Sequence, residues 1–289
     1  MIAGASWTWW IGFHVAVLFL LVIDAKLPSH RGDGAQAPTT AWIWTGVMVL
    51  AAGAFAAWIG FEQGRQRALE FVAGYTIETS LSIDNLFVFL VLFRGFCIDS
   101  ARQHRALLWG VGGAIVLRGI FIATGVTLLA RFHWITWIFG LFLLYAAFRL
   151  IRGGSAHAAI PAWIRRLQPA KDSLLPVIIA VEFTDLLFAL DSIPAVLSVS
   201  HDPFVVYTSN IAAILGLRSL YFALAALLDR FRYLHYGLGV LLAFVALKML
   251  AAPWFDVPIT LSLVLIGAIL AVCATASWIA AKREEAKVS

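Results

Sequence analysis

Nine apolar stretches dominate this chain, and each is long enough to cross the hydrocarbon core of a membrane. A spanning α-helix needs about 20 mostly apolar residues to cross roughly 30 Å of hydrocarbon. The stretches cover residues 7–23, 41–61, 68–93, 106–129, 133–151, 174–199, 208–229, 234–251 and 258–281. Lipid offers no partners for backbone polar groups, so such stretches must be helical. The sequence therefore predicts an all-α, polytopic membrane protein with about nine transmembrane helices.

The composition excludes several other classes of protein. Of the 289 residues, 62% are hydrophobic and 13% are charged, whereas soluble domains are about 45–50% apolar and about 25% charged. The formal net charge of +5 would suit a nucleic-acid partner, but the basic residues lie mainly in loops, where they signal topology. We expect contact with the lipid bilayer and none with nucleic acid. Neither a phosphate-binding loop nor a nucleophile–His arrangement is visible, so we do not expect an enzyme.

The distribution of basic residues predicts the orientation in the membrane. Fifteen Lys and Arg residues lie in one set of loops and the C-terminal tail, three lie in the opposite set, and three lie within spans. Basic loops stay in the cytoplasm, so we expect a cytoplasmic C-terminus and an external N-terminus in a bacterial inner membrane. No Lys or Arg precedes the first apolar stretch, so we interpret that stretch as a retained helix rather than a signal peptide.

Two apolar stretches carry acids near their centres. Residues 78–86 read Glu-Thr-Ser-Leu-Ser-Ile-Asp-Asn-Leu, and residues 185–193 read Asp-Leu-Leu-Phe-Ala-Leu-Asp-Ser-Ile. Each motif has an acid, a second acid six positions later, and then Asn or Ser. Glu182 lies just upstream of the second motif. At about 2.5–3.5 kcal/mol each, five such carboxylates cost on the order of 10–15 kcal/mol, comparable to the stability of a whole domain. They must therefore be bound, protonated or paired.

Further matches extend the acidic motifs into an internal repeat. Leu-Arg-Gly-Ile-Phe at 117–121 matches Leu-Arg-Ser-Leu-Tyr at 217–221, and residues 140–151 match residues 239–250 in the same order. Residues 70–151 and 176–251 thus form two copies of a three-helix unit. Because three is odd, the copies enter the membrane from opposite sides, which is an architecture of transporters.

The repeat divides the chain into five regions. We expect an N-terminal two-helix region at 1–66, a first repeat at 67–151, a cytoplasmic loop at 152–173, a second repeat at 174–251, and a last helix with its tail at 252–289. Apolar and basic residues mix in the loop, which suits a short helix at the interface. The helices outside the repeat are interpreted as scaffold or as a surface for dimers or membrane-protein partners.

The acids, with polar neighbours and two arginines that lie within apolar stretches, form the candidate site. The candidate metal ligands are Glu78, Asp84, Glu182, Asp185 and Asp191; the supporting polar residues are Ser82, Asn85, Ser192 and Asn210; the charge-compensating residues are Arg118 and Arg218. Asn210 could instead be a helix cap, which is the favoured interpretation. Oxygen ligands favour Mg²⁺, Ca²⁺ or Mn²⁺ over copper or zinc. Four motif acids and two arginines leave a charge of −2, which one divalent cation would neutralise.

Cys97 and Cys273 are interpreted as unpaired, and no permanently bound cofactor is expected.

Helical geometry does not by itself bring the acids of one motif together. Six residues separate Glu78 from Asp84, which places them about 120° apart around a helix. Either the helix unwinds or a neighbouring helix meets it. Pro194 disrupts the backbone near Leu190, so we predict a helix break close to Asp191.

These motifs resemble the signatures of the TerC family, whose members include Alx-type proteins. The resemblance is carried by residues 78–89 and 182–195, and by the shorter matches 103–105, 109–110, 209–211 and 216–221; it runs from about 62 to 251. It implies an integral membrane protein within the LysE-like transporter superfamily. It also implies links to tellurium resistance, manganese efflux and metal homeostasis.

The leading hypothesis is a transporter that exports a divalent metal cation, Mn²⁺ above all, by proton exchange. The acids would bind the metal, and Glu182 would carry protons because burial favours the neutral form of a carboxyl group. An alternative is a membrane scaffold of a stress-response or insertion complex, with a structural polar core. A third is an exporter of another small solute.

Overall fold

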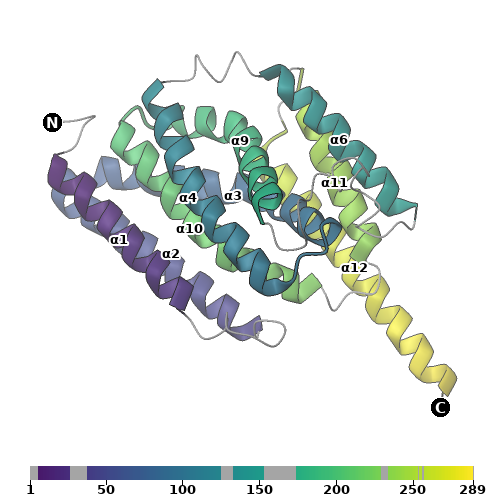
Figure 1. Ribbon diagram of the computed structural model, residues 1–289. Helices are drawn as coiled ribbons and strands as arrows, with labels where there is room; N and C mark the ends of the chain where they lie inside the picture. Colours follow the sequence, from purple (N-terminus) through teal and green to yellow (C-terminus); the bar gives the residue numbers. More distant parts are fainter. Residues whose placement is uncertain are drawn as a thin grey trace.

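The computed structural model describes residues 6–26, 38–124, 133–152, 174–228, 234–252, 254–255 and 257–288, and this part of the chain is helical (Figure 1). The helices are α1 (Trp7–Lys26), α2 (Pro38–Gln63), α3 (Arg65–Gly95), α4 (Ser100–Thr124), α6 (His133–Ile151), α9 (Leu175–Leu197), α10 (Pro203–Leu228), α11 (Leu234–Ala251) and α12 (Ile259–Val288). Six of them are long and apolar enough to cross a membrane, and α6 and α11 contain shorter apolar segments. The predicted all-α, polytopic membrane fold is confirmed. The predicted interfacial helix at 152–173 lies almost wholly outside the described residues.

Helices α3 and α10 form the centre of the molecule. They pack against each other, and α9, α2 and α4 pack around them. Residues 84–93 of α3 are buried without interruption, so the second half of this helix is enclosed on all sides. A helix that is apolar all round belongs in such a position. Both acidic motifs lie here, because α9 contacts α3 and α4.

The helix contacts are reciprocal between the two predicted repeats. Helix α3 contacts α10, as α9 contacts α4, and α6 packs most extensively against α11. A Cβ atom on Gly140 would lie 2.9 Å from Leu250, and one on Gly239 would lie 2.6 Å from Ile151. The start of each helix therefore faces the end of the other, so α6 and α11 run in opposite directions. This is the packing that an inverted repeat requires.

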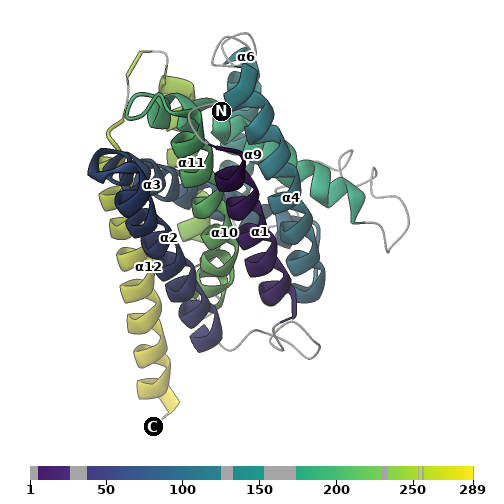
Figure 2. The same cartoon turned by 90° about the vertical axis from the view of Figure 1, so that its left-hand side faces the viewer.

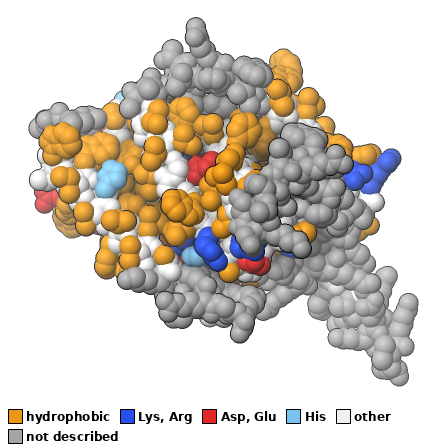
Figure 3. All heavy atoms as spheres, viewed as in Figure 1, with side chains coloured by type: hydrophobic (Ala, Val, Ile, Leu, Met, Phe, Trp, Pro, Cys, Tyr) orange, Lys and Arg blue, Asp and Glu red, His pale blue; other side chains and the backbone are white. Residues whose placement is uncertain are grey.

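Helices α1, α2 and α12 lie at the periphery. Figure 2 shows α1 and α2 side by side along one flank, and in both ribbon views α12 projects beyond the other helices to the C-terminus. Large apolar side chains such as Phe19, Leu50 and Val264 are exposed on these helices. Hydrophobic side chains also spread over the face in Figure 3. An apolar surface of this extent suits contact with lipid.

Helix α10 begins at Pro203, five residues before the predicted start. Proline is favoured in the first turn of a helix, and the Asp202 carboxylate accepts the backbone N–H of Phe204 at 2.9 Å. Asp202 is therefore the cap. Asn210 lies inside the helix, and its interpretation as a helix cap was wrong.

Candidate functional site

A buried arginine joins the two acidic motifs. Arg118 Nη2 lies 2.8 Å from Glu78 Oε1 on α3 and 3.6 Å from Asp185 Oδ1 on α9. The first acid of each motif is thus held by one guanidinium from α4. Glu78 and Arg118 are fully buried, and Asp185 is 7% exposed. The contact links one predicted repeat to the other.

Two polar side chains complete this arrangement. Arg118 Nη1 donates a hydrogen bond to the Asn210 side-chain oxygen, and the Asn210 amide donates to the Val206 carbonyl at 2.8 Å. The Ser82 hydroxyl donates to Glu78 Oε1 at 3.1 Å. We call Glu78, Ser82, Arg118, Asp185 and Asn210 the central cluster. With both acids ionised, two carboxylates and one guanidinium give it a net charge of −1.

The central cluster is costly to bury and strongly held together. Each ion loses several kcal/mol of hydration in a protein interior, and removing one partner of a buried pair costs about 3–5 kcal/mol. Glu78 Oε2 is buried and has no hydrogen-bond partner among the described residues. Buried polar atoms are nearly always satisfied. Because the central cluster has a net negative charge, this carboxylate oxygen is a place where a cation or a proton could bind.

Asp84, the second acid of the first motif, has a partner that the sequence analysis missed. Lys248 Nζ on α11 donates to Asp84 Oδ2 at 2.8 Å. Asp84 is 4% exposed, so this pair is also largely removed from water. The available signal was the position of Lys248 inside an apolar stretch, because ionisable groups there are usually paired or functional.

Glu182 lies against two glycines of α4, where no side chain covers the helix backbone. Both of its carboxylate oxygens are buried without a hydrogen-bond partner among the described residues. A Cβ atom on Gly113 would collide with this carboxyl group, and one on Gly110 would lie 3.0 Å from Val181. The two glycines, three positions apart, make the hollow that holds Glu182. A buried carboxylate without a cation is strongly disfavoured, which suits a group that holds a proton.

Arg218, the repeat counterpart of Arg118, pairs elsewhere. Its guanidinium forms an ion pair with Asp24 near the end of α1, and Nη1 lies 3.5 Å from His104 Nε2 on α4. Asp24 is itself only 4% exposed, so this ion pair is buried. The structure thus gives Arg218 a counter-ion from outside the repeat, and its predicted role at the empty metal site must be corrected to that extent.

The remaining candidate residues are only partly placed. The Asn85 side-chain oxygen and the Ser192 hydroxyl are buried without partners among the described atoms. Asp191 lies within α9, but its side chain lies outside what the structure describes. Among the described residues, no group of three or more His, Cys, Asp and Glu side chains is placed to hold a metal. In this conformation Arg118 and Lys248 occupy positions beside the acids that a bound cation would take.

The predicted helix break is wrong. Helix α9 continues from Leu175 to Leu197 with Pro194 inside it, and α3 continues from Arg65 to Gly95. Ser198 N–H donates to the Pro194 carbonyl at 3.0 Å, so regular bonding resumes at once. The sequence analysis had left a second way to assemble the site, which is a neighbouring helix. Neighbouring helices do meet the acids laterally, but they join different ones: Arg118 on α4 contacts the first acid of each motif, whereas Asp84 pairs with Lys248 on α11.

Comparisons with known proteins match this chain over most of its length. The family model described as "Integral membrane protein TerC family" matches residues 63–285. The "Putative membrane-bound redox modulator Alx" of Salmonella typhi is 38% identical, covering 96% of this chain and 96% of that protein. Its namesake in Escherichia coli K12 is 40% identical over 90% of this chain and 91% of that protein. An uncharacterized membrane protein of Myxococcus xanthus, STKORF319, is 38% identical over 93% of this chain and 92% of that protein. A search of solved structures found no significant match.

Proposed function

Since this chain belongs to the integral membrane protein TerC family, we propose that it exports a divalent metal cation, with Mn²⁺ as the first candidate, in exchange for protons. The observation that carries this proposal is the central cluster. A net negative set of oxygen ligands lies between two helix repeats and inside an apolar protein. Intramembrane acids of this kind mark ion pathways.

The ligand chemistry favours a hard cation. The described groups at the cluster are carboxylate, amide and hydroxyl oxygens, which suit Mg²⁺, Ca²⁺ and Mn²⁺. Two acids and Arg118 leave one negative charge, and Asp84 is balanced by Lys248. For a divalent ion to bind between the motifs, Arg118 must move away from Glu78 and Asp185. The proposal therefore includes a change in which the two repeats shift relative to each other and Arg118 is replaced by the ion.

Glu182 is the proposed proton carrier. It lies three residues, or nearly one helical turn, before Asp185 and has no cation beside it among the described residues. A carboxyl group so placed can hold a proton while the cluster is empty of metal. Release of that proton would accompany arrival of the cation. The same logic makes export depend on a proton gradient.

Binding of Mn²⁺ to the purified protein tests the site assignment. Calorimetry would compare the parent protein with Asp84→Asn and Asp191→Asn, and Asp99→Asn is the matched control, because Asp99 pairs with Arg102 at an exposed position. We expect about tenfold or greater loss of affinity in the first two variants and none in the control. Unchanged binding in both site variants would reject the assignment.

The relatives' name raises a redox role, which the cysteines of this chain can test. Cys97 is exposed, Cys273 is buried, and neither forms a disulfide in the described part of the chain. In our proposal they take no part in transport, and any redox effect follows from altered metal content. We predict that a double Cys97→Ser, Cys273→Ser variant keeps Mn²⁺ flux within about twofold of the parent, because neither thiol is a ligand for a hard cation. Loss of flux with intact folding would favour thiol chemistry.

A further inference from the structure

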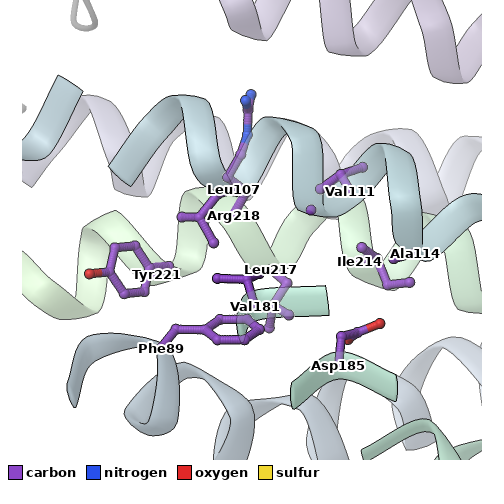
Figure 4. A pocket seen from close by; sticks show the side chains of 11 residues that line it. Phe89, Leu107, Val111, Ala114, Val181, Asp185, Ile214, Leu217, Arg218 and Tyr221 are labelled. Atoms are coloured by element: carbon purple, nitrogen blue, oxygen red, sulfur yellow. The ribbon is translucent and has the colours of Figure 1, made fainter. Parts of the chain in front are cut away.

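A small cavity lies on one side of Asp185. Its volume is about 30 Å³, which is enough to hold water, since a cavity needs about 10–15 Å³ to hold one molecule. Figure 4 shows Asp185 at one end of the cavity, Leu217 and Val181 in the middle, and Tyr221 and the stem of Arg218 farther along α10. The walls between these polar ends are mostly apolar. The cavity thus leads from the central cluster toward Arg218.

The aliphatic part of the Arg218 side chain lines this cavity, and its guanidinium lies outside it. In Figure 4 its guanidinium points away from Asp185. There it forms the ion pair with Asp24 and lies 3.5 Å from His104. Asp24, His104 and Arg218 are each less than 9% exposed. One buried cation is thus fixed between α1, α4 and α10.

A second polar contact lies one helical turn farther along α10. The Tyr221 hydroxyl donates to the Gln103 side-chain oxygen at 2.9 Å. Tyr221 is 2% exposed and also lines the cavity. Two contacts between α10 and its neighbours therefore lie at the same end of the cavity. Both would have to separate before anything larger than a water molecule could pass.

The other end of the molecule is held by different contacts. Arg67 on α3 pairs with Asp202 at 3.0 Å, and the Ser200 hydroxyl donates to Glu70 at 2.6 Å. Asp202 lies next to the start of α10, whereas Arg218 lies 15 residues beyond Pro203, a distance of about 22 Å along the helix. Polar contacts thus close the molecule on both sides of the central cluster.

We propose that the Asp24–Arg218 ion pair is the closed barrier of the cation's route between Asp185 and the end of the molecule where α1 ends and α4 begins. This inference rests on the proposed function for the identity of the passing ion. Like charges repel strongly where the dielectric constant is low, so a fixed guanidinium opposes a cation at this point. Asp24 holds the guanidinium in place. Opening requires α1 to release Arg218, which gives a helix outside the repeat a role in access.

Chemical labelling of the cavity wall tests the barrier without measuring transport. Ala114 lines the cavity and is 2% exposed. In a background lacking Cys97 and Cys273, Ala114→Cys would be labelled in vesicles by a membrane-impermeant maleimide applied to the side where α1 ends. Adding Asp24→Asn should speed labelling about tenfold or more. Loss of one partner of a buried ion pair can shift the equilibrium between the closed and open barrier by a factor of about ten or more.

Matched variants separate the barrier from general loosening. Asp99→Asn removes an exposed acid near the start of α4 and should leave the labelling rate unchanged. The exchange of Asp24→Arg with Arg218→Asp restores a pair and should restore protection. Arg218→Lys keeps the charge but loses the forked geometry, so it should be labelled at an intermediate rate. It also provides a second test of the barrier if Asp24→Asn does not fold.

Two results would overturn the barrier. One is labelling at the parental rate in both Asp24→Asn and Arg218→Lys; the other is a charge exchange that labels as fast as Asp24→Asn. Failure of the proposed function is distinct from these results. It would appear as absent metal binding or flux in the parent protein, while the labelling rates would still report whether the ion pair closes the cavity.

Discussion

Arg118 is the residue on which the centre of the molecule depends most. It is 1% exposed and contacts an acid from each motif as well as Asn210. Its removal leaves two carboxylates without a cation in a region that excludes water. Its positive charge therefore stabilises the fold. In the proposed function the same charge competes with the transported ion.

We predict that Arg118→Gln lowers the free energy of unfolding by about 3–5 kcal/mol, the usual cost of removing one partner from a buried ion pair. Unfolding of the purified protein in detergent would measure it. Arg102→Gln is the control, because Arg102 pairs with Asp99 at an exposed site and should cost less than about 1 kcal/mol. Similar costs for both variants would contradict the buried cluster.

Gly113 allows Glu182 to take its place. We predict that Gly113→Ala lowers proton-coupled flux about tenfold or more, because the added methyl group would collide with the Glu182 carboxyl group and displace the proposed proton carrier. Gly112→Ala is the control, since a Cβ there meets nothing within 4 Å. Flux of both variants would be measured in vesicles under a pH gradient. Equal flux in the two variants would remove Glu182 from the mechanism.

The sequence predicted the acids as a site and Arg118 and Arg218 as charge-compensating residues, but it did not say which acid each arginine contacts. An acid inside an apolar stretch is visible in one dimension because its cost is local. Partner choice depends on which helices touch. Arg118 and Arg218 occupy matching repeat positions, yet one contacts Glu78 and the other contacts Asp24. Asp24, the acid that pairs with Arg218, lies on α1, outside the predicted repeat.

At the scale of helices, α6 and α11 form the most extensive contact between the two predicted repeats. Gly140 and Gly239 occupy matching positions, and each receives the side chain near the end of the opposite helix. Small residues allow membrane helices to approach closely, and van der Waals packing then holds them. The reciprocal notches make this contact the natural place for two inverted units to join.

We predict that Gly239→Ala destabilises the protein by about 1–3 kcal/mol, the usual cost of overpacking. A Cβ atom there would lie 2.6 Å from Ile151 and 3.2 Å from the Ala147 carbonyl oxygen. Gly267→Ala on α12, where nothing lies within 4 Å, should be neutral or slightly stabilising, since alanine favours helices. Thermal unfolding in detergent would compare them. A neutral Gly239→Ala would mean that the helices are not packed as closely as described.

Helix boundaries and continuity were the parts of each element that sequence patterns predicted least well. Each apolar stretch overlaps a helix of the structure, and six of the described helices are long and apolar enough to cross a membrane, because hydrocarbon thickness is a strong constraint. The apolar pattern did not show that α10 begins at Pro203, because that start is set by the Asp202 cap and by proline in the first turn rather than by apolar length. The predicted break at Pro194 failed for a related reason. A proline near the end of a helix disturbs only the bonds of the last turn, and α9 ends three residues later.

At the scale of the whole molecule, three groups of ion pairs lie at successive positions between its two ends. Arg67 and Asp202 pair near the start of α10, Arg118 and its acids lie at the centre, and Arg218 with Asp24 lies toward the other end. A transporter must be closed on at least one side of its site at any moment, and two facing repeats provide a way to alternate between sides. The structure has polar contacts on both sides of the central cluster.

The central claim is tested most directly by Mn²⁺ flux into vesicles that contain only the purified protein, with and without a pH gradient. Asp185→Asn would be measured beside the parent, because Asp185 is the acid of the second motif that contacts Arg118. We predict gradient-dependent flux in the parent and a loss of about tenfold or more in the variant. Absence of flux from folded parent protein, or equal flux in the folded variant, would contradict the account.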